Sequence, residues 1–238
     1  MRFLVFQHIA SEHPGIFRKF LAAGGIPWDA IELDAGEAIP PLERYDALWV
    51  MGGPMDVWDV EDCPWIIEEK RAIRRWVREL DRPFMGLCLG HQLLADALGG
   101  TCGPQRPPEI GILDVALTPE AESDPVFAGL PKTFKALQWH SVRVAQPPEG
   151  AVVLASSAAC TCQAMRVGSR AWSMQYHVEI EQNTISDWGE IPAYAGALER
   201  THGAGALTRF DETAKPHMSD FTANAETLYG SFMQQVRK

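Results

Sequence analysis

The sequence of 238 residues has no long apolar run and no excess of positive charge. Its longest apolar runs, Ala47–Met51 and Ala151–Ala155, are far shorter than the roughly 20 residues that a membrane-spanning helix needs. Lys and Arg number 21 against 31 Asp and Glu, which gives a formal net charge of −10. Binding to nucleic-acid backbones or anionic membranes needs clustered positive charge. We therefore expect neither nucleic acid nor a membrane as a partner.

Cysteine is scarce, and no export signal is visible. The five cysteines are an odd number for a disulfide framework, and Met1–Ala10 carries a single basic residue without a small-residue cleavage pattern. We interpret Met1–Ala10 as a first strand and the cysteines as free thiols in a reducing compartment, which predicts a cytoplasmic protein. With 46% hydrophobic and 22% charged residues, the composition is that of a folded globular chain.

Motifs for metal and nucleotide binding are also missing. Cys160-Thr161-Cys162 has no second Cys/His pair at ligand spacing. The chain contains neither Gly-x-x-x-x-Gly-Lys nor a strand-borne Gly-x-Gly-x-x-Gly. We expect no metal and no cofactor.

Strand and helix patterns alternate over the first hundred residues. Apolar runs typical of strands occupy Arg2–His8, Trp28–Leu33, Ala47–Met51 and Pro83–Leu87. Helical spacings occupy Pro14–Ala23, Cys63–Leu80 and Leu89–Leu98. This alternation predicts parallel βαβ units with helices on both faces of a sheet.

After Gly100 the pattern changes to short strands separated by prolines. Strand-like segments occupy Ile110–Leu117, Phe134–Trp139, Ala151–Ala155, Gln163–Val167 and Ala171–Tyr176. The prolines that separate them are Pro104, Pro107, Pro108, Pro147 and Pro148. Gly168-Ser169-Arg170 predicts a hairpin, and this half of the sheet is expected to be more antiparallel. Residues 181–238 are predicted to be helical, ending in the helix Ser219–Val236.

We predict one domain over residues 1–238 of the α/β class. Its architecture would be a three-layer, doubly wound, mostly parallel sheet of flavodoxin-like type with an antiparallel β extension. Residues 1–100 would form the parallel half, residues 101–180 the antiparallel strands, and residues 181–238 the C-terminal helices.

The segment Gly86-Leu87-Cys88-Leu89-Gly90-His91-Gln92 carries the strongest chemical signal. It lies where a buried strand meets a helix, and Gly-x-nucleophile-x-Gly at such a junction forms a sharp elbow above a parallel sheet. A thiol at a helix N-terminus is favoured as thiolate by the helix dipole. Cys88 is thus a candidate nucleophile; the alternative is a buried structural cysteine.

A cysteine nucleophile needs a base and a group that orients the base. His177, in Gln175-Tyr176-His177-Val178-Glu179, is the best placed histidine, since it ends a predicted strand. Residues i and i+2 of an extended segment point to the same side, so Glu179 can accept from one imidazole nitrogen. The alternative is a surface histidine followed by a solvated carboxylate.

Acyl transfer also needs donors for an oxyanion. A buried strand runs into Gly52-Gly53-Pro54, and the peptide N–H of Gly53 could point into the site beside that of Leu89. Gly-Gly-Pro is otherwise an ordinary turn signal.

These three segments, in this order, resemble the class I (triad) glutamine amidotransferase family. That family has Gly-x-Cys-x-Gly-x-Gln at the elbow, Gly-Gly-Pro after the oxyanion strand and His-Pro-Glu around the base; this sequence has Val178 in place of the proline. The tracts Met51–Asp56, Cys63-Pro64-Trp65 and Gln138-Trp139-His140-Ser141 make it most similar to stand-alone proteins that resemble the amidotransferase domain of GMP synthase.

The resemblance implies a role for each matching residue. Cys88 would be the nucleophile, His177 the base and later the acid, and Glu179 the residue that orients His177. Gly53 and Leu89 would form the oxyanion hole. The residues that would hold the amino and carboxylate ends of glutamine are Gln92, Ser141 and Val142.

The implied reaction is hydrolysis of the glutamine γ-amide through a γ-glutamyl thioester, with ammonia released. The chain length fits one amidotransferase domain, so we expect any synthetase to be a separate subunit. One alternative is a stand-alone hydrolase of γ-glutamyl amides or peptides, and another is a non-catalytic binding module that retained the fold. A basic stripe, Lys70, Arg71, Arg74, Arg75 and Arg78, is either a solvated helix surface or a docking site for an acidic partner.

Overall fold

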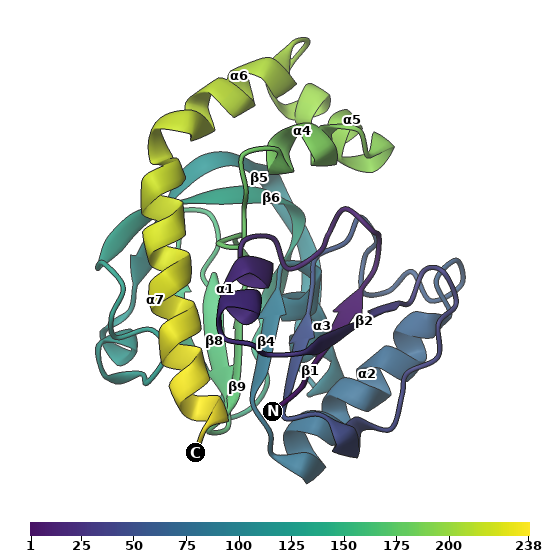
Figure 1. Ribbon diagram of the computed structural model, residues 1–238. Coiled ribbons are helices and arrows are strands. Elements are labelled where there is room, and N and C mark those ends of the chain that lie inside the picture. Colours follow the sequence, from purple (N-terminus) through teal and green to yellow (C-terminus); the bar gives the residue numbers. More distant parts are fainter.

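A nine-stranded sheet runs through the molecule, with helices on both of its faces (Figure 1). The computed structural model describes residues 1–238. The strands lie in the order β2-β1-β3-β4-β9-β8-β7-β5-β6. The first five pair in parallel, and they are β1 (Phe3–Gln7), β2 (Trp28–Glu32), β3 (Ala47–Val50), β4 (Phe84–Leu87) and β9 (Ala171–Met174).

The other four strands pair antiparallel and extend this sheet. They are β5 (Thr101–Leu117), β6 (Thr133–Gln146), β7 (Val152–Ser156) and β8 (Ala164–Val167). Strands β8 and β9 form an antiparallel pair joined through Gly168-Ser169-Arg170, as the hairpin pattern predicts. The predicted fold class, an α/β sheet with a parallel part and an antiparallel extension, is confirmed.

Strand β5 differs from the sequence prediction. It begins at Thr101, not at Ile110, and it runs through Pro104, Pro107 and Pro108, which we interpret above as boundaries. The other two prolines, Pro147 and Pro148, do separate β6 from β7. The register of β5 with β6 shifts between Pro104 and Glu109. Pro107 and Pro108 lie in this irregular stretch, where no ladder hydrogen bond is lost with their missing N–H groups. The prediction of a short strand is therefore wrong here, because a bulge accommodates the prolines within one long strand.

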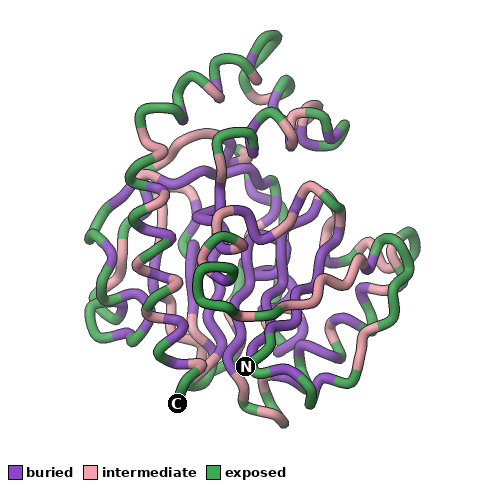
Figure 2. The backbone as a smooth tube through the Cα atoms, in the orientation of Figure 1, coloured by how far each residue is buried: buried purple, intermediate pink, exposed green.

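Alternate residues of the central strands contribute to two different cores, because successive strand side chains point to opposite faces. Phe3 belongs to the core under α1 (Phe17–Ala23) and α7 (Met218–Val236). Leu4 belongs to the core under α2 (Trp65–Arg75) and α3 (Leu89–Ala97). Figure 2 shows the central strands buried between these two helical layers.

A helical arm lies at one end of the molecule (Figure 1). It consists of α4 (Thr184–Gly189), α5 (Pro192–His202) and α6 (Ala206–Ala214). A third apolar core joins the arm to the antiparallel strands, where Trp139 of β6 packs against Tyr194 and Phe210 at centroid distances of 5.6 and 5.1 Å. The remaining short elements are the 3-10 helices Leu42–Arg44, Pro119–Ser123 and Lys215–His217 and the π-helical turn Trp76–Leu80.

The predicted helix Cys63–Leu80 is present as α2 and the π-helical turn Trp76–Leu80 that continues it. Helix α2 ends at Arg75, and the chain after the turn reverses at Asp81, whose φ is 45°. Of all the helices, none is both long and apolar enough to cross a membrane.

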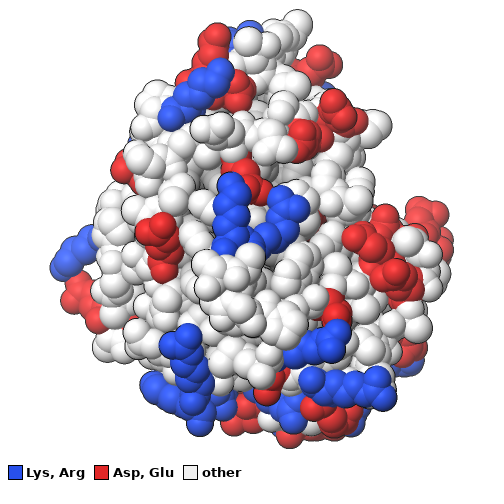
Figure 3. All heavy atoms as spheres, viewed as in Figure 1, with Lys and Arg blue, Asp and Glu red and all other residues white.

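Several basic side chains have acidic partners within the chain. On α2, Lys70 pairs with Asp96 at 2.6 Å, and Arg71 and Arg75 pair with Glu68 and Glu43. Basic side chains also gather over α1 beside an acidic group (Figure 3). There, Glu181 pairs with Arg18 at 2.7 Å and with Lys19 at 2.8 Å. The stripe on α2 is thus largely neutralised within the chain, as expected of a solvated helix surface.

Candidate active site

Cys88 lies at the sharp turn between β4 and α3. Its φ of 50° and ψ of −102° place it outside the regions that L-residues usually adopt. A Cβ atom on Gly90 would collide with the carbonyl oxygen of Val50, and one on Gly86 would collide with the carbonyl of Gly90. The two flanking glycines are therefore required for the turn, which presents Cys88, a residue that is 5% exposed, at the N-terminus of α3.

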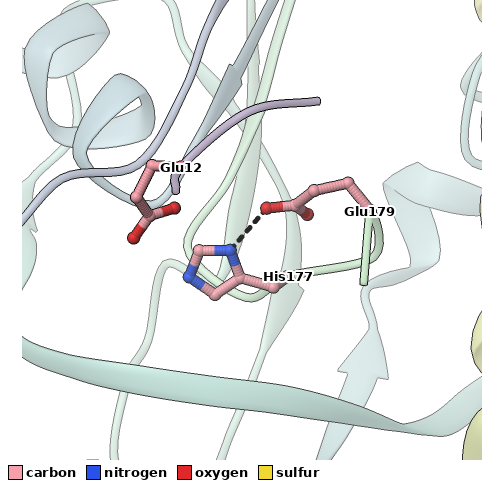
Figure 4. A group of neighbouring side chains, drawn as sticks. All are labelled: Glu12, His177 and Glu179. Atoms are coloured by element: carbon pink, nitrogen blue, oxygen red, sulfur yellow. Dashed lines mark hydrogen bonds and ion pairs between the residues drawn. The ribbon is translucent and has the colours of Figure 1, made fainter. Parts of the chain in front are cut away.

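His177 and Glu179 follow β9 and form a hydrogen-bonded pair (Figure 4). Nδ1 of His177 lies 2.6 Å from Oε1 of Glu179, and the N–H of Val178 donates to Oε2 at 2.9 Å. Trp188 of α4 packs edge-on against the imidazole, at a centroid distance of 4.5 Å. Both oxygens of Glu179 are engaged, so the imidazole is held in one orientation.

The environment of His177 favours its protonated form. Burial opposes a charge on the ring, but the charges of Glu179 and of the Cys88 sulfur, together with the hydrogen bond to Glu179, outweigh it. The pKa of His177 is therefore raised well above its ordinary value of 6.5. An imidazolium beside Cys88 is the partner that a thiolate nucleophile needs.

The strand end that carries Glu179 is anchored on the segment before α1. The N–H of Ile16 donates to the carbonyl oxygen of Glu179 at 2.8 Å. Gly15, with φ of 48°, packs so closely on this carbonyl that a Cβ atom there would overlap it. The ion pairs of Glu181 with Arg18 and Lys19 tie the following residues to α1. The backbone on both sides of Glu179 is thus fixed by a different part of the chain.

A second carboxyl group, on Glu12 in the loop after β1, also faces the imidazole of His177 (Figure 4). Its Oε1 accepts a 2.5 Å hydrogen bond from the hydroxyl of Tyr194 in α5, while Oε2 is buried without a hydrogen-bond partner. Burial raises the pKa of Glu12 and outweighs the opposing effects of His177 and Tyr194. Sequence reasoning missed Glu12, because nothing in its local pattern shows that this loop reaches His177.

The side chains of Glu12, His177 and Glu179 offer ligand atoms that all lie within 4.8 Å of one another. Several of these atoms already serve hydrogen bonds. Nδ1 of His177 is bound to Glu179, Oε2 of Glu179 accepts from Val178, and Oε1 of Glu12 accepts from Tyr194. These hydrogen bonds therefore already engage at least one polar atom of each of the three side chains.

A cavity of about 230 Å³ opens beside Cys88. It is lined by Gly53, Pro54, Met55, Asp56, Cys88, Leu89, Gln92, Ile110, Trp139, His140, Ser141, Val142, Ala193, Tyr194, Ala197 and Arg200. All of the predicted oxyanion and substrate-binding residues therefore line the same cavity as the thiol. Sequence reasoning missed Asp56, Tyr194 and Arg200, which add charged and polar groups to this cavity. Tyr194 and Arg200 lie in α5, whose sequence contains no recognisable motif.

The peptide N–H groups of Gly53 and Leu89 donate to no other group of the protein. Gln92 has a different environment, since its Nε2 donates to the carbonyl of Val142 at 3.2 Å and to Oε1 of Gln175 at 3.1 Å. Nε2 of Gln175 in turn lies 3.6 Å from the sulfur of Cys88. The cavity thus offers two free backbone donors close to a thiol that a buried amide network holds in place.

The family model of glutamine amidotransferase class-I matches residues 21–186. The chain belongs to this family. Glutamine-hydrolyzing GMP synthase of Aeropyrum pernix is 31% identical over 207 residues, which are 84% of this chain and 37% of that protein. One subunit of the glutamine-hydrolyzing GMP synthase of Sulfolobus acidocaldarius is 30% identical over 154 residues, or 64% of this chain and 77% of that polypeptide.

Solved structures of glutamine amidotransferases share the fold over nearly the whole chain. One from Methylobacillus flagellatus is 27% identical with a TM-score of 0.84, covering 98% of this chain and 94% of that one. Another, from Thermotoga maritima, has a TM-score of 0.86 at 24% identity and covers 100% and 99% of the two chains. Glutamine amidotransferases of class I are generally cysteine-dependent enzymes that hydrolyse glutamine.

Proposed function

We propose that this protein hydrolyses the γ-amide of glutamine with Cys88, His177 and Glu179 as its catalytic triad. One observation carries the proposal: the strained elbow places the Cys88 thiol on the same cavity as two unengaged peptide N–H groups. The imidazolium of His177, oriented by Glu179, supplies the proton that an amide leaving group needs.

The reaction would proceed in two halves. The Cys88 sulfur attacks the amide carbon, and the N–H groups of Gly53 and Leu89 donate to the resulting oxyanion. On collapse the C–N bond breaks, and His177 gives its proton to the departing ammonia, which leaves a γ-glutamyl thioester. His177 then takes a proton from water, the hydroxide attacks the thioester, and glutamate leaves as the C–S bond breaks. Each oxyanion donor would lower the barrier by about 3–4 kcal/mol.

Gln92, Ser141 and Val142 would hold the amino and carboxylate ends of glutamine. Asp56 and Arg200, which both line this cavity, carry opposite charges, and this suits a zwitterionic amino acid. The volume of about 230 Å³ fits a small γ-glutamyl compound.

We propose further that the ammonia passes to a separate acceptor enzyme. The relative from Sulfolobus acidocaldarius is named as one subunit of a GMP synthase, and this supports an acceptor that is a synthetase on another chain. The alternative is a stand-alone hydrolase of γ-glutamyl amides or peptides, which would turn over small substrates without a partner.

The test is ammonia release from glutamine together with hydroxylamine trapping of the thioester as γ-glutamyl hydroxamate. Cys88→Ala should abolish both, whereas the matched variant Cys102→Ala, which alters a cysteine outside the cavity lining, should keep both. Ammonia release by Cys88→Ala would refute the triad. Turnover of γ-glutamyl anilides but not of glutamine would identify the stand-alone hydrolase.

A further inference from the structure

His8 and Glu69 form a fully buried pair that the proposed reaction does not use. His8 follows β1, Glu69 lies on the inner face of α2, and both side chains are 0% exposed. Nε2 of His8 lies 2.8 Å from Oε1 of Glu69. Trp65, one helical turn before Glu69, stacks on the imidazole with an interplanar angle of 13°. Helix α2 therefore fixes both the plane and the rotation of this ring.

The other ring nitrogen of His8 contacts the oxyanion loop. Nδ1 lies 2.7 Å from the carbonyl oxygen of Gly52. A carbonyl oxygen can only accept, so Nδ1 must carry a hydrogen. The carboxylate of Glu69 accepts from Nε2, so both ring nitrogens carry a hydrogen and the carboxylate stabilises the imidazolium. His8 also packs against the residue after Gly52, because a Cβ atom built on Gly53 would lie 2.9 Å from Cβ of His8.

The Gly52 carbonyl and the Gly53 N–H belong to the same peptide group. This peptide is trans, so its C=O and N–H bonds point in opposite directions. When His8 holds the carbonyl on the α2 side, the N–H of Gly53 is directed away from α2. That N–H donates to nothing in the protein, and Gly53 lines the cavity beside Cys88.

We propose that His8 and Glu69 are positioning residues that fix the Gly52–Gly53 peptide with its N–H aimed at the oxyanion. The inference deepens the proposed function and rests on it. His8 touches no substrate; it acts through the orientation of one peptide plane. Two glycines at this site have little intrinsic preference for one peptide orientation, so an external hydrogen bond is needed to select it.

Three variants separate this role from simple packing. His8→Leu fills the space but lacks a donor. His8→Asn keeps an N–H at the position of Nδ1 and so keeps the bond to Gly52. Ile66→Val, on the same buried face of α2, is the control for a small loss of packing.

Two kinetic readouts are compared on the folded enzymes. Glutamine hydrolysis needs the oxyanion donor, whereas alkylation of Cys88 by iodoacetamide forms a C–S bond and releases iodide without any oxyanion. We expect His8→Leu to lower kcat about 10²-fold with KM and the alkylation rate unchanged, because one oxyanion donor is misplaced. His8→Asn and Ile66→Val should stay close to the wild type.

Several results would overturn the proposal. They are wild-type kcat in His8→Leu, equal losses of kcat and alkylation in His8→Leu, and a His8→Asn variant as impaired as His8→Leu. If the wild type does not hydrolyse glutamine at all, the proposed function fails, and the carbonyl ¹³C resonance of Gly52 then decides the inference. An upfield shift in His8→Leu but not in His8→Asn supports the positioning bond, and no shift refutes it.

Discussion

The hydroxyl of Tyr194 donates a 2.5 Å hydrogen bond to Oε1 of Glu12, which joins residues 182 positions apart in the chain. Tyr194 belongs to the helical arm and lines the cavity, while Glu12 faces the imidazole of His177. This bond links the arm to the centre of the candidate site through one buried contact.

Tyr194→Phe should lower the free energy of unfolding by about 1–3 kcal/mol, because it leaves both oxygens of a buried carboxyl group without a partner. Urea unfolding would measure the loss. Tyr229→Phe, which removes a hydroxyl from a partly buried tyrosine of α7, is the matched control and should change stability by less than about 0.5 kcal/mol. A double-mutant cycle with Glu12→Gln should give a clear coupling energy, and strict additivity would contradict the link.

Glu179→Gln should move the alkaline limb of the pH–rate profile to lower pH. His177 must be protonated to expel ammonia, and the charge of Glu179 helps to raise its pKa above 6.5. Activity should therefore persist above pH 6.5 in the wild type and fall as pH rises through the raised pKa. Removal of the charge lowers the pKa of His177, so activity should fall at a lower pH in the variant. Measurement of kcat/KM from acid to alkaline pH checks this. If the alkaline limb does not move, a group other than His177 is responsible for it.

A glutamine-analogue alkylator should label Cys88 alone. Burial raises the pKa of Cys102 and of Cys162 to about 12 and that of Cys160 to about 11, and it also raises the pKa of Cys63. These four thiols are thus poor nucleophiles at neutral pH, whereas Cys88 lies at a helix N-terminus beside His177. Peptide mapping after labelling identifies the modified residue, and even labelling of several cysteines would argue against an activated thiol.

Two glycine substitutions should have opposite effects. Gly90→Ala should destabilise the protein and abolish alkylation of Cys88, because the new methyl group would collide with the carbonyl of Val50. Gly230→Ala, in helix α7 with open space around it, should raise the free energy of unfolding by about 0.5–1 kcal/mol. Thermal or urea unfolding of both variants tests the pair, and an active Gly90→Ala enzyme would show that the elbow is less constrained.

The parts of the site that depend on short-range sequence patterns could be predicted from the sequence. The glycines around Cys88 and the i, i+2 spacing of His177 and Glu179 are short-range patterns, and the structure places these residues together. The parallel strand pattern of the first half likewise depends on local periodicity, and it predicted the sheet well.

Glu12, Tyr194, His8 and Glu69 could not be found in this way. Their contacts depend on β1 lying beside β3 and on the arm folding over the cavity, which local periodicity does not encode. The prolines of β5 were misleading for a related reason: whether Pro107 ends a strand or lies in a bulge depends on the register of β6.

Gly15 has a consequence for how mutations would be tolerated. Its backbone lies against the carbonyl of Glu179 at a φ of 48°, so every side chain both overlaps that carbonyl and strains the turn. In a mutational scan selected for activity, position 15 should be as intolerant as His177, although it touches neither the thiol nor the cavity. Intolerance at Gly15 would reflect its role in positioning Glu179. A sequence comparison alone would mistake Gly15 for a catalytic residue.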